Sequence, residues 1–204
     1  MAKILSVVSR AGLTRVLDPV ASALLRAGIT PNAITVVGTV GVLVGAIGFG
    51  ARGKFVVAVV IVTLSAFTDL IDGAMARRRG SASRFGALLD STMDRISDGA
   101  VFGSVAYWLA TTGQPRGAVA ALVCLVAGQI ISYVKARAEG LGLTADVGIA
   151  ERAERLILVG LGGLLTGLGV RPALEIALWL LAVLSLITIG QRMVHVYRQA
   201  QVSA

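Results

Sequence analysis

Aspartates occur in two strongly apolar stretches of the chain, where acidic side chains are rare. Asp69 and Asp72 are three residues apart, and Asp90 and Asp94 are four apart. In a helix, either spacing places both members of a pair on one face. A carboxylate at the centre of a membrane-inserted helix costs roughly 2.5–3.5 kcal/mol. We therefore expect these side chains to do chemistry rather than to serve packing.

The two aspartate pairs are predicted to share one metal-binding cavity. Asp69 lies eight residues before Arg77, and Asp94 lies eight residues after Gly86. Both would lie about 12 Å below the ends of antiparallel neighbouring helices. Four carboxylates held together take up protons unless cations are present. Oxygen ligands favour magnesium, manganese or calcium over zinc, and two such ions clamp both oxygens of a phosphoryl displacement.

The elements that position these groups are predicted to be transmembrane helices. Hydrophobic residues make up 56% of the 204 residues and charged residues 15%, too little polar surface for a soluble domain of this size. Thr30 and Pro31 are typical of a helix start. Apolar segments close to the ~20 residues of a membrane span then follow at 33–51, 55–75, 87–112, 118–138, 149–168 and 172–194.

We expect an all-α integral membrane protein with six transmembrane helices in residues 30–204. Residues 1–29 are predicted to form an amphipathic helix in the membrane interface, with a short soluble hairpin as the alternative. Glycine pairs four residues apart are expected to allow close helix contacts: Gly41/Gly45, Gly99/Gly103 and Gly163/Gly167.

The charge distribution predicts the orientation. The formal net charge is +8, and the basic residues cluster at segment ends, which favours lipid headgroups or a phosphorylated substrate over nucleic acid. Most of them fall on the side that carries both termini and the aspartate ends of the helices. The positive-inside rule makes that side cytoplasmic, in the inner membrane of a cell.

The aspartate motif resembles that of a known family. Residues 69–77, a gap of eight and residues 86–94 fit the pattern DxxDGxxAR-x8-GxxxDxxxD of the CDP-alcohol phosphatidyltransferases at every fixed position. The six-span layout and the amphipathic N-terminus are similar as well. Members of that family transfer a phosphatidyl or related group from a CDP-linked donor to an alcohol and release CMP. The resemblance also implies a homodimer.

The resemblance implies a role for each motif residue. Asp69, Asp72 and Asp90 would bind one metal ion, and Asp69, Asp90 and Asp94 a second, with magnesium expected and manganese as the alternative. Asp94 would also be the general base. The residues implied to contact CDP-diacylglycerol lie in or beside the motif and at the start of the first span: Asn32, Ala33, Ile34, Thr35, Gly73, Arg77 and Ser83.

The acceptor alcohol is predicted from a second group of basic residues. Segments 132–139 and 149–155 look like the bacterial phosphatidylinositol-phosphate synthase branch of the family. Lys135, Arg155 and Arg192 are therefore expected to bind the phosphate of inositol phosphate, because a neutral acceptor would not need them. Two alternatives stay open. These cations could only satisfy the positive-inside rule and pair with Glu151 and Glu154, or the acceptor could be glycerol 3-phosphate.

Other functions remain as alternatives. A cation or proton transporter also uses intramembrane acids, but distributes them through the full membrane depth. An inactive scaffold would not need the complete motif. Asp98, one turn beyond the motif, either extends the metal site through water or pairs with an arginine such as Arg95, and we favour the pairing.

Overall fold

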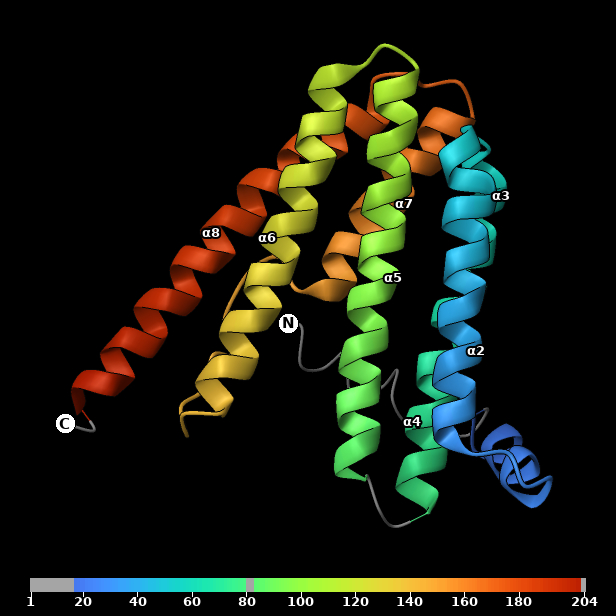
Figure 1. Ribbon diagram of the computed structural model, residues 1–204, viewed down its shortest axis with the longest axis vertical. Helices are drawn as coiled ribbons and strands as arrows, with labels where there is room; N and C mark the ends of the chain where they lie inside the picture. Colours follow the sequence, from blue (N-terminus) through green and yellow to red (C-terminus); the bar gives the residue numbers. More distant parts are fainter. Residues whose placement is uncertain (1–16, 80–82, 203–204) are drawn as a thin grey trace. The chain divides into compact units, whose positions relative to one another are not determined.

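The computed structural model describes residues 17–79 and 83–202, and every regular element in that part of the chain is helical (Figure 1). The α-helices after residue 30 are α2 (Pro31–Leu43), α3 (Phe55–Ala66), α4 (Thr68–Arg78), α5 (Arg84–Thr111), α6 (Pro115–Glu139), α7 (Arg152–Gly167) and α8 (Ala173–Val202). A π-helix (Val44–Phe49) and a 3-10 turn (Gly50–Arg52) continue α2. The all-α prediction is confirmed.

Within residues 17–79 and 83–202, four helical stretches have the length and apolar composition of membrane spans: Pro31–Arg52, Phe55–Arg78, Pro115–Glu139 and Ala173–Gln201. They correspond to the first, second, fourth and sixth predicted spans. Helix α5 is long enough but carries acidic and basic residues in its first half, and α7 has only 16 residues. Their crossing of the membrane stays a prediction.

The start of the first span is as predicted, but the second span is not one continuous helix. The Thr30 hydroxyl accepts a hydrogen bond from the Ala33 N–H, and Pro31 occupies the first helical position. Between α3 and α4 the helix is interrupted at Phe67. There the Thr68 hydroxyl donates to the Ser65 carbonyl, so a side chain competes with the helical backbone pattern.

The described residues divide into two compact units, and each is treated by itself. The first contains residues up to 44 together with 60–97, and the second contains 45–59 together with 98 onward. In the first unit, residues 17–26 are helical, and Ala21 packs against Ala74 and Met75 of α4. Residues 1–16 of the predicted amphipathic helix lie outside the described residues. The predicted division at residues 29 and 30 stays a prediction.

Helix α2 packs closely on α4 in the first unit. A Cβ atom at Gly38 would overlap the Thr68 hydroxyl and lie 3.3 Å from the Ser65 carbonyl oxygen. A Cβ atom at Gly41 would overlap the Ser65 hydroxyl. The absence of a side chain at these two positions therefore sets how closely α2 approaches the polypeptide around the helix break.

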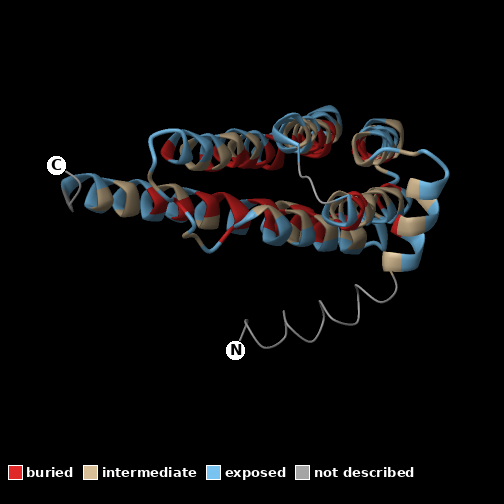
Figure 2. Cartoon of the chain, turned by 90° about the horizontal axis from the view of Figure 1, so that it is seen from below, coloured by how far each residue is buried: buried red, intermediate tan, exposed pale blue. Residues whose placement is uncertain are grey.

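The second unit is built around α8, which packs against α6 and α7. Buried and exposed residues occupy different sides of the same helix, as in the helix that ends at the C-terminus (Figure 2). Many exposed positions on α8 are apolar: Ile176, Leu180, Val183, Leu186 and Ile187. An apolar exposed surface of this kind suits contact with lipid chains.

The glycine pairs behave differently from one another. A Cβ atom at Gly167 would lie 3.0 Å from a Val56 methyl group, as expected of a close helix contact. In contrast, a Cβ atom at Gly99 or Gly103 would meet no atom of the described residues within 4 Å. The prediction of close contact was wrong for that pair, because spacing alone does not say which helix face has a neighbour.

Candidate metal and phosphate site

The four motif aspartates all belong to the first compact unit. Helix α4 carries Asp69 and Asp72, and the first part of α5 carries Asp90 and Asp94. Asp72 is buried, with 8% of its surface exposed, and its charge is repelled by those of Asp69 and Asp90. Carboxylates from α4 and α5 therefore lie within electrostatic range of one another.

A hydrogen bond from a third helix holds the most buried of these carboxylates. The Thr35 hydroxyl of α2 donates to Asp72 Oδ2. Thr35 is itself buried, and its hydroxyl also lies 3.2 Å from the Pro31 carbonyl oxygen one turn earlier. Sequence reasoning assigned Thr35 to the donor nucleotide and missed this contact, since it depends on how α2 packs against α4.

The donor atoms fit a hard divalent ion, although the side chains do not form a closed cage. Within the described ranges, no three His, Cys, Asp or Glu side chains are gathered closely enough to hold a metal. Asp94 Oδ2 lies 3.9 Å from a guanidinium nitrogen of Arg95. Four carboxylates repel one another, so a tight cage of them requires cations. All-carboxylate oxygen chemistry is what magnesium and manganese prefer.

Two of the predicted donor-contacting residues lie at the start of α5. The Ser83 hydroxyl accepts a hydrogen bond of 2.9 Å from the Gly86 N–H and so caps the helix. A Cβ atom at Gly86 would lie 3.3 Å from Asn32 Oδ1, so the beginnings of α2 and α5 adjoin in this unit. Asn32, Ser83 and the motif glycine Gly86 are thus brought together.

The other predicted donor contacts have different surroundings. Arg77 is exposed, and a Cβ atom at Gly73 would meet only Arg77 Nη1, at 3.4 Å. Ala33 is exposed, whereas Ile34 packs against the hydrophobic cluster formed by Ala21 and α4. Their predicted roles in donor binding stay predictions.

The predicted acceptor residues belong to the second unit, and two of them are buried. Arg155 is 1% exposed, and its Nη2 lies 3.3 Å from Asp98 Oδ2. Arg192 is 4% exposed and donates to two backbone carbonyls, those of Ile131 at 2.7 Å and Val147 at 2.9 Å. Arg192 thereby ties α8 to α6 and to the loop before α7.

Lys135 has the most exposed side chain of the three predicted acceptor residues. Its Nζ lies 2.5 Å from Asp146 Oδ1 and 3.9 Å from Glu139 Oε1. The hydrogen bond from Lys135, followed by its charge, holds the pKa of Asp146 below its usual range. Sequence reasoning did not anticipate Asp146 as the partner, because it lies in the loop between α6 and α7 rather than on a helix.

Asp98 forms ion pairs with arginines, which is the role that the sequence analysis favoured over an extension of the metal site. Its Oδ1 lies 3.4 Å from Arg152 Nε, while its Oδ2 lies beside Arg155. The partners come from α7, which is more than fifty residues away in the chain. No local signal in the sequence would have identified them.

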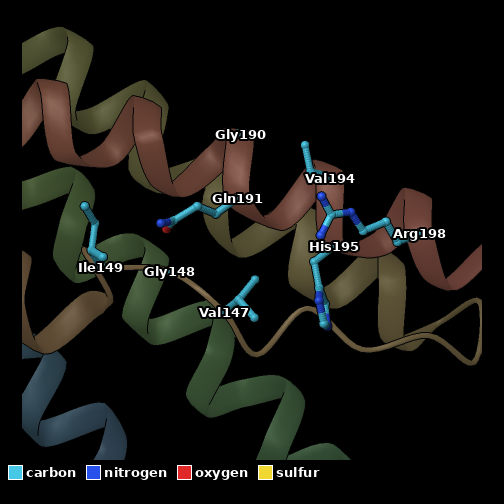
Figure 3. A pocket seen from close by; sticks show the side chains of 8 residues that line it. All are labelled: Val147, Gly148, Ile149, Gly190, Gln191, Val194, His195 and Arg198. Carbon is cyan, nitrogen blue, oxygen red and sulfur yellow. The ribbon is translucent and has the colours of Figure 1, made fainter.

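A separate pocket of about 480 Å³ lies between α8 and the loop before α7 (Figure 3). Its lining comes from the loop and from two turns of α8: Val147, Gly148, Ile149, Gly190, Gln191, Val194, His195 and Arg198. None of the predicted metal, donor or acceptor residues lines it.

Comparisons with known proteins agree with the motif. The family model of the CDP-alcohol phosphatidyltransferases matches residues 28–191. A phosphatidylinositol phosphate synthase of Mycobacterium marinum is 49% identical over 198 residues, covering 93% of this chain and 82% of the relative. The motif aspartates, Lys135 and Arg155 fall within residues 28–191, and Arg192 lies one residue beyond that match.

The chain is also similar to solved structures of a phosphatidylinositol phosphate synthase. The crystal structure of a Mycobacterium tuberculosis phosphatidylinositol phosphate synthase with CDP-DAG bound has a TM-score of 0.86 and 45% identity, covering 90% of this chain and 94% of that chain. The same enzyme in complex with manganese and citrate has a TM-score of 0.84, also at 45% identity, with coverages of 89% and 88%.

Proposed function

Because the chain belongs to the CDP-alcohol phosphatidyltransferase family, we propose that it transfers the phosphatidyl group of CDP-diacylglycerol to inositol phosphate. The products are phosphatidylinositol phosphate and CMP. The protein is an enzyme of phospholipid biosynthesis, and the family assignment sets aside the ion-transporter alternative. The observation that carries the mechanism is the set of motif carboxylates on α4 and α5, with Asp72 held by Thr35.

We propose that Asp69, Asp72 and Asp90 hold one divalent ion and that Asp69, Asp90 and Asp94 hold a second. Magnesium is the expected metal, and the manganese complex of the solved relative supports a divalent ion. Bound there, the ions would neutralise the diphosphate and stabilise the departing CMP. The protein's own contribution is to hold the ions and to position the two substrates around them.

Asp94 is the proposed proton acceptor. The acceptor hydroxyl forms a bond to the phosphorus that carries diacylglycerol, and its proton passes to the Asp94 carboxylate. The bond from that phosphorus to the bridging oxygen breaks, and CMP leaves with the electron pair. Asn32, Ala33, Ile34, Thr35, Gly73, Arg77 and Ser83 are proposed to position the donor. Gly73 would do so by letting the nucleotide approach the backbone.

Lys135, Arg155 and Arg192 are proposed to bind the phosphate of the acceptor. The support is their cationic chemistry, the place of Lys135 and Arg155 within the family match, and the names of the relatives. Arginine and lysine bind phosphate through charge-assisted hydrogen bonds. Glycerol 3-phosphate carries the same group and is the competing acceptor.

The membrane arrangement is proposed from the charge pattern. Six spans would place both termini and the active site on the cytoplasmic side of the inner membrane, by the positive-inside rule. Residues 1–29 would lie in the interface as an amphipathic helix. A homodimer is proposed by resemblance to the family.

The test is an acceptor panel with the purified protein. CDP-diacylglycerol and magnesium are supplied with inositol phosphate, glycerol 3-phosphate or free inositol, and CMP release and the lipid product are measured. We expect turnover with inositol phosphate and a phosphatidylinositol phosphate product. Turnover with glycerol 3-phosphate but not with inositol phosphate would show that the acceptor is glycerol 3-phosphate. The family's reaction would still hold. No CMP release with any of these alcohols would contradict the proposed function.

A further inference from the structure

Asp98 is a buried acid that lies beyond the family motif of residues 69–94. It is 2% exposed, and each of its carboxylate oxygens faces a different arginine of α7. We call Asp98, Arg152 and Arg155 the Asp98 cluster. Within it, the side chain of Arg152 is 28% exposed and that of Arg155 is 2% exposed. One arginine thus reaches the surface of the unit while the other is enclosed.

A glycine on a third helix makes room for the enclosed arginine. A Cβ atom at Gly128 of α6 would overlap Arg155 Nη1 and lie 3.1 Å from its Cζ. The Arg155 guanidinium is therefore confined between the backbone of α6 and the carboxylate of Asp98 on α5. A long, flexible side chain held on two sides loses little further freedom when it binds a ligand.

We propose that Asp98 is a positioning residue that orients Arg152 and Arg155 toward the phosphate of the acceptor. The inference rests on the proposed function, because Arg155 is proposed there to bind the phosphate of the acceptor, and it adds Arg152 to the same role. Asp98 lies one helical turn after Asp94 on α5, about 6 Å along the axis. The same helix thus carries the proposed proton acceptor and the residue that sets the direction of the phosphate-binding arginines.

The first experiment compares Asp98→Asn with the wild-type enzyme. The apparent KM for inositol phosphate should rise roughly tenfold or more, as is typical when a residue that orients a binding group is lost. The KM for CDP-diacylglycerol should change less than about twofold. Gly128→Ala should also raise the acceptor KM, because it displaces Arg155 without removing any charge. Equal losses for donor and acceptor would overturn the proposal.

A double-mutant cycle tests whether Asp98 acts through Arg152. Arg152→Gln alone should raise the acceptor KM, and adding Asp98→Asn should raise it by less than the product of the two single effects, since both changes break the Asp98–Arg152 interaction. Two effects that multiply in full would show that Asp98 does not act through Arg152, which would overturn the positioning of that arginine. The controls are Arg116→Gln and Glu175→Gln, a basic and an acidic residue of the same unit outside the Asp98 cluster. Both should leave the acceptor KM unchanged.

Asp98→Asn leaves Arg155 buried without its counter-charge, which can prevent folding. The variant Asp98→Asn with Arg155→Met removes both members of the buried pair and should recover thermal stability. Under the proposal its acceptor KM stays raised. If the pair only supports the fold, this double variant regains the wild-type acceptor KM, and the proposal is overturned.

Failure of the inference and failure of the proposed function give different results. Wild-type protein that turns over inositol phosphate establishes the acceptor, whatever the variants do. A normal acceptor KM in the Asp98 variants then overturns the positioning role alone. Wild-type protein that turns over only free inositol overturns both, because no phosphate is then present for the arginines to bind.

Discussion

Thr35 of α2 donates a hydrogen bond to the carboxylate of Asp72 on α4, across 37 positions of the sequence. Asp72 is the most buried of the four motif aspartates, so a donor that fixes its orientation acts on the proposed metal site. Residues that orient metal-binding carboxylates in this way tune metal affinity in many proteins. Thr35 is therefore a structural part of the site, whatever contact it makes with the donor nucleotide.

Thr35→Val should lower the affinity for the activating metal. Loss of the hydrogen bond to Asp72 is expected to raise the magnesium concentration for half-maximal activity roughly 10–100-fold. Thr39→Val is the matched control, because the buried Thr39 hydroxyl donates to the Thr35 carbonyl of its own helix. A raised KM for CDP-diacylglycerol with unchanged magnesium dependence would assign Thr35 to the donor instead.

Asp94→Asn should abolish turnover while donor binding largely survives. The amide cannot accept the hydroxyl proton, and loss of a general base typically costs a factor of about 10²–10⁴. Binding of CDP-diacylglycerol is measured by calorimetry beside the CMP-release assay. Asp90→Asn provides the contrast, because it should weaken metal and donor binding together. Near-normal activity of the Asp94 variant would show that Asp94 is not the general base.

Gly73→Ala should fold normally and bind the donor poorly. The added methyl group would meet only Arg77 Nη1, at 3.4 Å, an ordinary contact, and alanine is the better helix former. Thermal stability should therefore match or slightly exceed that of the wild type, while the KM for CDP-diacylglycerol rises about tenfold or more. An unchanged KM would show that the nucleotide does not approach the backbone at Gly73.

Gly38→Ala should destabilise the protein through steric overlap. The new methyl group collides with Thr68 and approaches the Ser65 carbonyl, and overpacking of this kind typically costs about 1–3 kcal/mol. Gly103→Ala is the matched control, since its methyl group would meet nothing within 4 Å. The melting temperatures of the two variants are measured in the same detergent and compared. Equal melting temperatures would contradict the close packing of α2.

Removal of divalent metal should stop the reaction without unfolding the helices. Excess chelator is expected to abolish CMP release, and added magnesium or manganese to restore it, because carboxylate oxygens prefer hard cations. Helical content, followed by circular dichroism, should stay constant throughout. A steeper than first-order dependence on magnesium would support two ions. Full activity in excess chelator would rule out the proposed metal site.

The helices and the residues of the proposed reaction could be predicted from local features of the sequence. Hydropathy and helix-start signals are local, so the predicted spans agree with α2, α5, α6, α7 and α8 to within a few residues at most of their ends. The spacing of Asp69, Asp72, Asp90 and Asp94 is local as well, and it identified the family. The interruption at Phe67 was not predicted, because a hydroxyl that competes with the backbone leaves the hydropathy pattern unchanged.

Which side chains contact one another depends on the tertiary structure. Thr35 with Asp72, Asp98 with two arginines of α7, and Gly128 beside Arg155 are all contacts between helices that are distant in the chain. Helical periodicity states which residues share a face, but the neighbour of that face is set by the packing of whole helices. The open space beside Gly99 and Gly103 has the same origin.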